Sequence, residues 1–354
     1  MDTTAETQTR SKVTIIAGFL GSGKTTMIQR LIKQPTLRSK IAIIQNEFSQ
    51  DMGIEAPLMT NADGEVLDEF YEMPNGWIWW TVKDDLVSTL EVLVQNKPEI
   101  EHIFIETNGL ADPANIIKIF WLDDGMIDNL EYNYTMGVID ANSFSSNFEN
   151  KELSEALFKQ LVHADKIIIN KIDLVDKQEI ENVESKIMKF NPVVEIMHTE
   201  YANTDLEYLT ETPKRVKTFK ETLDDDQNEH NIESNGVHSH SAHSHDIKPI
   251  YIKIEGLLDP EKVEYLMGII HWETDDITLL RCKGLYYCGD KDSDNISQYM
   301  LQGVDDTFEW RLIGSNFSNS ERPETDFDWT SKFLFVGKQI DSDDLEQKLW
   351  EWKI

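Results

Sequence analysis

The residues with the clearest chemical signature form a glycine-rich segment close to the start of the chain. The segment fits the spacing of a phosphate-binding loop, in which Gly and four residues are followed by Gly-Lys-Ser/Thr. Glycines let such a loop curl so that its backbone N–H groups point at phosphate oxygens. Lys24 can reach the β- and γ-phosphates, and the Thr25 hydroxyl can ligate Mg²⁺. A chance glycine-rich turn is disfavoured, because an apolar run precedes the segment and helical spacing follows it. We predict that nucleotide phosphates contact Gly18, Phe19, Leu20, Gly21, Ser22, Gly23, Lys24, Thr25 and Thr26.

An acidic residue, Glu106, follows the apolar run 102–105, where a buried strand is expected to end. In a phosphate-loop protein, a carboxylate at such a strand end normally holds Mg²⁺, often through water. We predict Glu106 as a Mg²⁺ ligand together with Thr25, the alternative being an ordinary acidic residue at a strand end. Gly109, three residues later, offers an N–H that can sense a γ-phosphate. Glu47 and Glu106 are candidates for orienting the attacking water, so the predicted catalytic residues are Lys24, Thr25, Glu106 and Glu47.

The segment Asn170-Lys171-Ile172-Asp173 follows another apolar run and indicates which base is bound. The carboxylate of Asp173 can accept two hydrogen bonds from guanine N1–H and N2–H₂. Adenine offers no such donor pair, so we expect roughly a hundredfold or greater preference for guanine. The Lys171 stem can lie along the base, and Asn170 can brace the loop. The guanine preference makes an ATP-dependent kinase a disfavoured reading.

Histidines supply a separate candidate metal site. His238, His240, His243 and His245 place four imidazoles within eight residues of a polar segment. Neutral imidazole binds Zn²⁺ or Ni²⁺, so the tract can gather metal weakly, or it is a solvated low-complexity segment. The two cysteines, Cys282 and Cys288, match no zinc spacing, and we expect them to pack within a strand.

The order of apolar and polar segments indicates the elements that must position these residues. Near-continuous apolar runs alternate with helical spacing, which predicts a doubly wound, mostly parallel α/β domain of the P-loop NTPase type. A small α+β domain is predicted to follow it. In the first domain, strands are expected at 13–17, 41–45, 102–105, 136–139 and 166–169, with helices at 26–33, 86–95 and 152–162. In the second, strands are expected at 250–254, 278–287, 298–304, 309–313 and 332–336, with helices at about 260–271 and 343–352. The predicted boundaries are a flexible 1–12, a nucleotide domain 13–212, an acidic and histidine-rich linker 213–248, and a C-terminal domain 249–354.

Composition excludes several classes of protein. The chain has 354 residues and a formal net charge of −32, which repels nucleic acid and anionic membrane surfaces. We find no apolar run long enough to cross a bilayer and no secretion signal, so we expect a cytoplasmic or nuclear protein.

Taken together, the three motifs resemble the CobW-type GTPases, a group related to nickel chaperones for urease and hydrogenase. The zinc-regulated GTPase metalloprotein activators are the branch that matches best. This resemblance implies zinc delivery to a client enzyme coupled to GTP hydrolysis, with a type 1 methionine aminopeptidase as the client of that branch. The matching segments are Gly18 to Thr26, Gln45 to Phe48, Glu106 to Pro113, Asn170 to Asp173, Arg281 to Leu285 and Gln302 to Val304.

Two departures from the family pattern bear on metal binding. The family carries Cys-x-Cys-Cys where this chain has Trp77, Trp79 and Trp80, and an indole N–H offers no lone pair to a metal. In addition, Met1 to Lys12 contains no Cys-Pro-x-Leu-Val-Pro segment of the kind that docks the client, and Ser49-Gln50 replaces a usual Gly-Glu. The tryptophans can fill space in the domain, anchor a partner, or result from a recoded UGA codon or mutation of native cysteines. A GTP-regulated protein-binding switch without metal is therefore the alternative function.

Overall fold

The computed structural model describes residues 10–32, 40–45, 70–72, 79–122, 129–213, 247–259, 261–265, 268, 278–289, 296–317 and 329–351. The chain divides into two compact units, one of Met1–Ser185 with Val194–Lys214 and the other of Lys186–Val193 with Arg215–Ile354. The boundaries at 212/213 and 248/249 stay predictions, because residues 214–246 lie outside the described residues.

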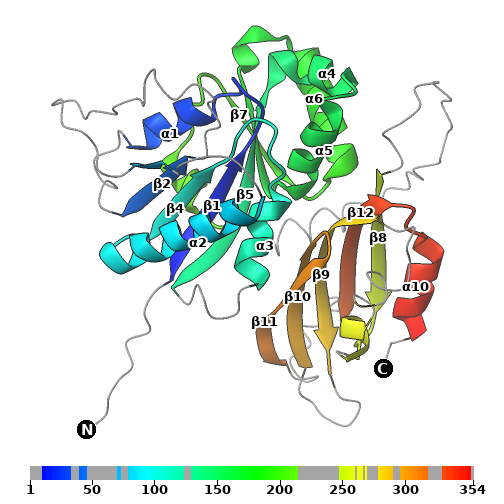
Figure 1. Ribbon diagram of the computed structural model, residues 1–354. Helices are drawn as coiled ribbons and strands as arrows, with labels where there is room; N and C mark the ends of the chain where they lie inside the picture. Colours follow the sequence, from blue (N-terminus) through cyan, green and yellow to red (C-terminus); the bar gives the residue numbers. More distant parts are fainter. Residues whose placement is uncertain are drawn as a thin grey trace, which may run out of the picture. The chain divides into compact units, whose positions relative to one another are not determined.

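A seven-stranded sheet forms the centre of the first unit, in the order β3-β2-β4-β1-β5-β6-β7 (Figure 1). Every pairing between its described strands is parallel. Sheets of this kind are covered on both faces, which accounts for the fully buried runs in β4 and β6. The predicted doubly wound α/β fold is confirmed. The strands are β1 (Ser11–Ala17), β2 (Ile41–Gln45), β3 (Phe70–Glu72), β4 (His102–Glu106), β5 (Leu130–Asp140), β6 (Lys166–Asn170) and β7 (Glu195–Thr199).

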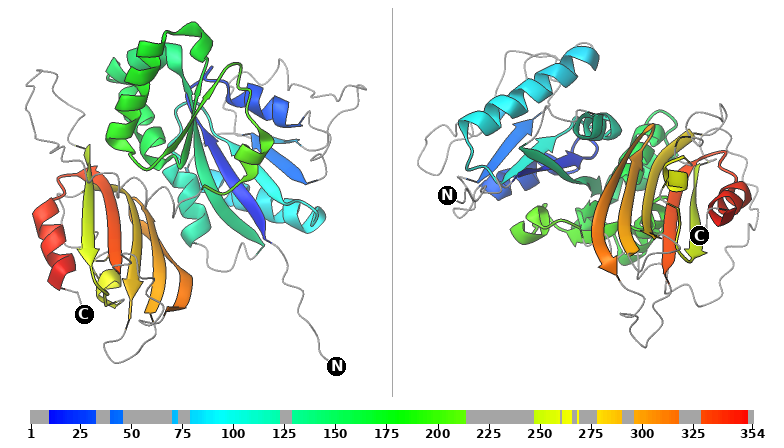
Figure 2. Two further views of the ribbon diagram at one scale, coloured as in Figure 1. Left: turned by 180° about the vertical axis from the view of Figure 1, so that it is seen from behind. Right: turned by 90° about the horizontal axis from the view of Figure 1, so that it is seen from below.

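Helices cover the two faces of this sheet and bury separate apolar clusters. On one face, α1 and α7 pack Met27 and Leu209 against Phe104 and other strand residues. On the opposite face, α2 and α3 pack against neighbouring strand positions such as Ile103. Figure 2 shows α1 and α2 on opposite sides of the strands. The helices are α1 (Lys24–Ile32), α2 (Trp79–Asn96), α3 (Ala114–Leu122), α4 (Ala141–Glu149), α5 (Ser154–His163), α6 (Lys177–Phe190) and α7 (Leu206–Thr210), with a 3₁₀ turn η1 (Ile172–Leu174).

A buried lysine fastens the end of the first unit to its sheet. Lys166, at the start of β6, is almost fully buried and donates hydrogen bonds to the backbone oxygens of Tyr208 (2.7 Å) and Glu211 (2.8 Å). Its ammonium also lies over the rings of Tyr208 and Tyr134, at 4.2 and 4.8 Å from their centroids. Hydrogen bonds and ring faces together offset the cost of burying the charge.

The second unit is a five-stranded antiparallel sheet in the order β11-β10-β9-β12-β8. Helix α10 buries Leu345 and Leu349 in the apolar cluster on this sheet. Both cysteines are buried free thiols in β9, and burial raises their pKa, to about 12 for Cys288. They pack within a strand, as predicted. The elements are β8 (Ile247–Glu255), β9 (Thr278–Cys288), β10 (Ile296–Val304), β11 (Thr307–Phe317), β12 (Thr330–Lys338) and α10 (Ser342–Glu351).

Two elements of the first unit extend well beyond their predicted bounds. Strand β5 begins at Leu130 rather than 136, because the buried polar Asn133 finds partners in Thr14 and Thr212 and does not interrupt it. Helix α2 begins at Trp79 rather than 86, ahead of the segment whose apolar spacing predicted it. Of the helix predicted at 260–271, the described residues 261–265 and 268 are helical.

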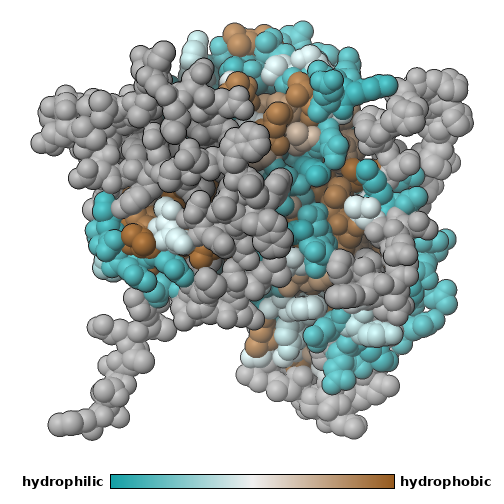
Figure 3. Space-filling view, in the orientation of Figure 1, coloured by the Kyte–Doolittle hydropathy of each residue, from teal (hydrophilic) through white to brown (hydrophobic). Residues whose placement is uncertain are grey.

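The surface carries hydrophilic residues interleaved with smaller hydrophobic patches over the described part of the face in Figure 3. None of the described helices combines the length and apolar character that a bilayer-spanning helix needs.

Candidate functional site

The predicted phosphate loop connects β1 to α1, with Gly18, Gly21 and Gly23 all at positive φ. A side chain at Gly18 would collide with the backbone oxygen of Val138 in β5, and one at Gly23 would collide with the amide of Asn170. Glycine is therefore required by close approach as well as by backbone conformation. The loop therefore packs against the carboxyl ends of β5 and β6, at the edge of the sheet where ligands bind in open α/β sheets.

Lys24 and Thr25 begin α1 and turn toward this loop and β4. The Lys24 ammonium, 6% exposed, donates to the backbone oxygens of Gly18 (2.6 Å) and Phe19 (3.2 Å). The Thr25 hydroxyl donates to Glu106 Oε1 at 2.8 Å, and Glu106 is 8% exposed. Thr25 and Glu106, predicted from separate motifs, are thus in direct contact. Thr26 is exposed on the first turn of α1.

The segment after β4 lies against the phosphate loop. The Thr107 N–H donates to the backbone oxygen of Ile16 at 2.9 Å, which fixes the start of the segment beside β1. A Cβ on Gly109 would come within 2.6 Å of the Leu20 nitrogen, so the two backbones nearly touch. The structure therefore places Gly109 beside the phosphate loop.

Asn170, at the end of β6, ties the predicted base-binding segment to the phosphate loop. It is 2% exposed and donates from Nδ2 to the backbone oxygen of Ser22 at 2.9 Å. Its Oδ1 accepts from the Thr199 hydroxyl (3.0 Å) and from the Ala202 N–H (2.8 Å). The Nδ2 group therefore faces the phosphate loop, and Oδ1 faces the end of β7 and the loop that follows it. Phosphate and base segments consequently share one edge of the sheet.

Lys171 and Asp173 follow Asn170 on the surface side of this edge. Lys171 has a positive φ of 62°, and its ammonium lies 2.7 Å from Asp140 Oδ2. Asp173 lies in η1 and is exposed, so its carboxylate is accessible to a ligand.

Three residues that contact this site are absent from the sequence-based set. Asp140, which pairs with Lys171, stands at the carboxyl end of β5, and that position after an apolar run is a signal the sequence offers. Thr199 ends β7 and Ala202 lies in the loop that follows. The strand sequence Glu-Ile-Met-His-Thr is too mixed to predict from apolar spacing. Tyr201 and Ala202 both have positive φ, near 55°, which aims the Ala202 N–H at Asn170.

Several predicted residues are not placed by the structure. Glu47, Trp77, His238, His240, His243 and His245 lie outside the described residues. The backbones of Trp79 and Trp80 begin α2, but their side chains are not described. Over the described ranges, no group of three or more His, Cys, Asp or Glu side chains is arranged to hold a metal ion.

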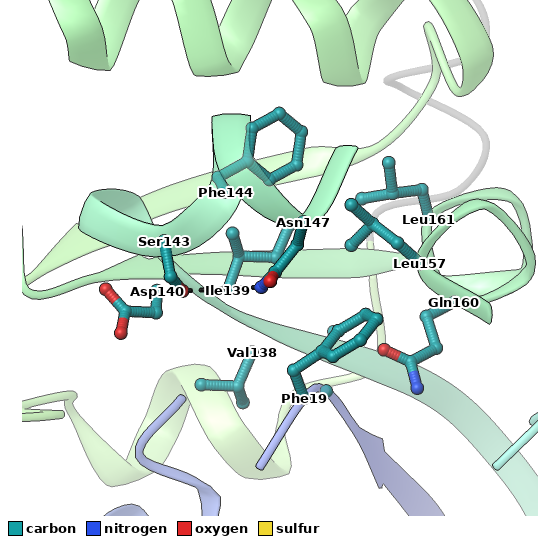
Figure 4. Close-up of a pocket in the computed structure, with 12 residues that line it drawn as sticks. Phe19, Val138, Ile139, Asp140, Ser143, Phe144, Asn147, Leu157, Gln160 and Leu161 are labelled. Atoms are coloured by element: carbon teal, nitrogen blue, oxygen red, sulfur yellow. Dashed lines mark hydrogen bonds between the residues drawn. The ribbon is translucent and has the colours of Figure 1, made fainter. Parts of the chain in front are cut away.

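Beside the phosphate loop lies a small pocket between Phe19 and the helices α4 and α5 (Figure 4). Its walls are mainly apolar, with Phe144 from α4 and Leu157 from α5. Gln160 and Asp140 are among its polar lining residues. The pocket therefore borders both the phosphate loop and the residue that pairs with Lys171.

Known proteins resemble this chain along most of its length. The "Zinc-regulated GTPase metalloprotein activator 1" of Schizosaccharomyces pombe is 29% identical, over 93% of this chain and 82% of its own. The "Zinc chaperone CobW" of Sinorhizobium sp is 32% identical, over 53% of this chain and 58% of its own. The crystal structure of Zn(II)-bound YjiA GTPase from Escherichia coli superposes with a TM-score of 0.64 at 21% identity, covering 98% of this chain and 99% of that one, which shows a common fold.

The sequence model described as "CobW/HypB/UreG, nucleotide-binding domain" matches residues 12–198, which include every predicted nucleotide-site residue from Gly18 to Asp173. That match spans more than half of the 354 residues. The chain belongs to the CobW/HypB/UreG family and is a P-loop GTPase.

Proposed function

We propose that this protein is a GTP-hydrolysing metallochaperone in which GTP turnover controls the delivery of zinc to a client metalloenzyme. The observation that carries the nucleotide part is the buried Asn170 amide, which is hydrogen-bonded to Ser22 of the phosphate loop and to Ala202. Because one side chain holds these segments, the phosphate and base loops form a single site. That arrangement suits one guanine nucleotide spanning both.

In this proposal Lys24, with the N–H groups from Gly18 to Thr26, binds the triphosphate and stabilises the charge that develops during phosphoryl transfer. Thr25 and Glu106 would hold Mg²⁺, which would neutralise phosphate charge when bound. Both side chains offer oxygen atoms, the ligand type that Mg²⁺ prefers, and these oxygens lie 2.8 Å apart. Gly109 senses the γ-phosphate, and Glu106 or Glu47 orients the attacking water.

Base selection is assigned to the segment after β6. The exposed Asp173 carboxylate accepts the guanine N1–H and N2–H₂ groups. The Lys171 stem lies along the base while its ammonium stays paired with Asp140 at 2.7 Å. Asn170 holds the segment in place through its bonds to the phosphate loop.

Zinc is the proposed cargo, and the names of the curated relatives favour a cargo-carrying protein over a cargo-free binding switch. Indole nitrogens donate hydrogen bonds and do not ligate metal, so Trp77, Trp79 and Trp80 do not replace a thiolate site. The imidazoles of His238, His240, His243 and His245 are the remaining candidate ligands. The proposed client, by resemblance, is a type 1 methionine aminopeptidase.

The experiment compares GTP turnover by the wild-type protein and Lys24→Ala, with Lys177→Ala on the exposed face of α6 as the matched control. We expect a slow basal rate, on the order of 10⁻⁴ to 10⁻² per second, for the wild type and the control. Loss of Lys24 is expected to abolish nucleotide binding or turnover. Equal phosphate release by wild type and Lys24→Ala contradicts the proposed catalytic role.

A further inference from the structure

We propose that Gln160 of α5 is a positioning residue for GTP hydrolysis, because its amide fixes the segment that carries Gly109 against the phosphate loop. The proposal rests on the function proposed above and extends it to a side chain that no motif contains. Gln160 touches neither phosphate loop nor base segment through a hydrogen bond. It acts through the backbone of the segment after β4.

The contact between α5 and this segment is made by two hydrogen bonds from one buried amide. Gln160 is 2% exposed, and its Nε2 lies 3.2 Å from the backbone oxygens of both Gly109 and Ala111. Among the hydrogen bonds of the described residues, these two oxygens accept from no other group. Loss of these two hydrogen bonds would therefore free the segment at Gly109, the residue that lies beside Leu20.

The orientation of the amide follows from its neighbours. With Nε2 facing two carbonyl oxygens, both contacts are hydrogen bonds, whereas a flipped amide would bring three oxygens together. In Figure 4 the Gln160 oxygen points toward the ring of Phe19, in the phosphate loop. That oxygen is buried and has no hydrogen-bond partner in the described part of the chain. An apolar residue would avoid this cost, so the amide is explained by what its nitrogen holds.

A neighbouring side chain secures the far end of the same segment. The Lys159 ammonium lies 3.1 Å from Asp112 Oδ2, and His163 Nε2 lies 3.9 Å from Asp112 Oδ1. Helix α5 thus holds the segment at Asp112 as well as at Gly109 and Ala111. With Asp112 retained, loss of the Gln160 bonds would loosen the Gly109 end while the rest stays attached.

This arrangement predicts an effect on GTP that GDP does not share. Gly109 is assigned to the γ-phosphate, which GDP lacks, while the phosphate loop and the base segment bind both nucleotides. A misplaced Gly109 N–H should therefore lower turnover and the affinity for a GTP analogue. The affinity for GDP should stay at the wild-type value.

The test uses the full chain with Gln160→Leu and Gln160→Glu, and with Gln178→Leu and Gln178→Glu on the exposed first turn of α6 as matched controls. Fluorescent GDP and a non-hydrolysable GTP analogue give the two affinities, and phosphate release gives kcat. Thermal unfolding confirms that each variant is folded. We expect kcat of Gln160→Leu to fall on the order of tenfold to a hundredfold, since small displacements of catalytic groups have effects of this size.

The Gln160→Glu variant adds a second readout, the pH dependence of kcat, which a change in packing alone would not alter. Its carboxylate would face two carbonyl oxygens in a buried position, which raises its pKa, and only the protonated form can donate. The kcat of Gln160→Glu relative to wild type should therefore rise as pH falls from about 8 to about 6, whereas the Gln160→Leu ratio stays flat. Asp112, Lys159 and His163 face this position in every variant, so their titration cancels in the ratios.

The outcomes separate this proposal from the one on which it rests. A wild-type protein that binds and hydrolyses GTP while Gln160→Leu matches its kcat overturns the role of Gln160 alone. Equal losses of GDP and GTP-analogue affinity, or parallel pH profiles for the two Gln160 variants, also overturn it, because they indicate a general structural defect. A wild-type protein that does not bind or hydrolyse GTP instead refutes the proposed function.

Discussion

At the scale of single residues, the nucleotide site depends on side chains that join segments rather than on isolated ligands. Asn170 is the clearest case, because its one amide contacts the phosphate loop and the loop after β7. These hydrogen bonds use both the Nδ2 donor and the Oδ1 acceptor of the amide. Neither an apolar residue nor an acid could make the same set of bonds.

Asn170→Ala should lower the free energy of unfolding by about 2–4 kcal/mol, because it leaves the buried Ser22 oxygen and Ala202 N–H without this partner. Chemical denaturation of the nucleotide-free protein measures the change. Asn142→Ala, at an exposed position of α4, is the control and should have little effect. An Asn170→Ala protein as stable as wild type would show that the brace is dispensable.

Asp173→Asn should reduce the preference for GTP over ATP by roughly a hundredfold or more, because the amide cannot accept both guanine donors. The same amide can donate to the carbonyl oxygen that xanthine carries in place of the guanine amino group, so affinity for xanthosine triphosphate should rise. Competition titrations against a fluorescent nucleotide measure all three affinities. Glu181→Gln, an exposed charge change on α6, controls for net charge, and unchanged preference in Asp173→Asn would rule out Asp173 as the base-selecting residue.

At the scale of elements, strand β4 has a buried histidine at one end and Glu106 at the other. Burial, and then the charge of Lys12, lower the pKa of His102 to about 4. Its ring stacks on Phe104 with centroids 5.7 Å apart, and its Nε2 lies 3.4 Å from Asn133 Nδ2. The imidazole of His102 is therefore neutral in the folded protein at neutral pH.

Acid should destabilise the first unit through His102. Since the pKa in the folded state lies below the unfolded value near 6.5, the unfolded chain binds the proton more tightly, and stability is lost as pH falls from about 6.5 toward 4. Between neutral pH and about pH 5 the loss should be on the order of 2 kcal/mol. His102→Gln should lack this part of the pH dependence, measured as the difference between the two denaturation profiles, in which the carboxylates cancel. Parallel profiles would contradict the assignment.

Apolar spacing predicted β1, β2, β4, β5 and β6 of the first sheet, helices α1, α2 and α5, and all five strands and the closing helix of the second unit, because buried strands and amphipathic helices leave strong periodic signals. It did not name β3, α3, α4 or α6, or the short α7 and β7, whose residues are mixed. Nor did it predict the extension of β5 through Asn133, which depends on partners 119 and 79 residues away in the chain. At the site, sequence motifs named the phosphate loop, Glu106 and Asn170. They could not name Gln160 or Ala202, because each acts through a backbone contact that exists only in the folded chain.

At the scale of the whole molecule, the nucleotide machinery matches the family while the expected thiol ligands do not occur in the sequence. Glu106 contacts the phosphate loop at Thr25, and Asn170 contacts it at Ser22. Trp77, Trp79 and Trp80 occupy the positions of three thiolates. The nucleotide motifs therefore occur in this chain without the thiolates that the resemblance leads us to expect.

Replacing Trp77, Trp79 and Trp80 together by Cys should create tight zinc binding with a stoichiometry near one, because three thiolates at family spacing form most of a tetrahedral site. Calorimetry on chains lacking residues 238–245 removes the histidine contribution from the comparison. A triple Trp→Ser variant, which loses the rings without gaining thiolates, is the control and should stay zinc-free. Tight zinc binding by the Trp form after removal of residues 238–245 would contradict this account.

Mass spectrometry of the protein from its source shows whether positions 77, 79 and 80 are Trp or Cys.

Strand β6 connects two distant parts of the first unit, residues 208–211 and the phosphate loop. At its beginning, the Lys166 ammonium donates hydrogen bonds to the backbone oxygens of Tyr208 and Glu211. At its end, Asn170 grips the phosphate loop. A five-residue strand is a stiff rod of about 13 Å between its first and last Cα. A displacement of residues 208–211 is thus transmitted along β6 to the residue that holds the phosphate loop in place.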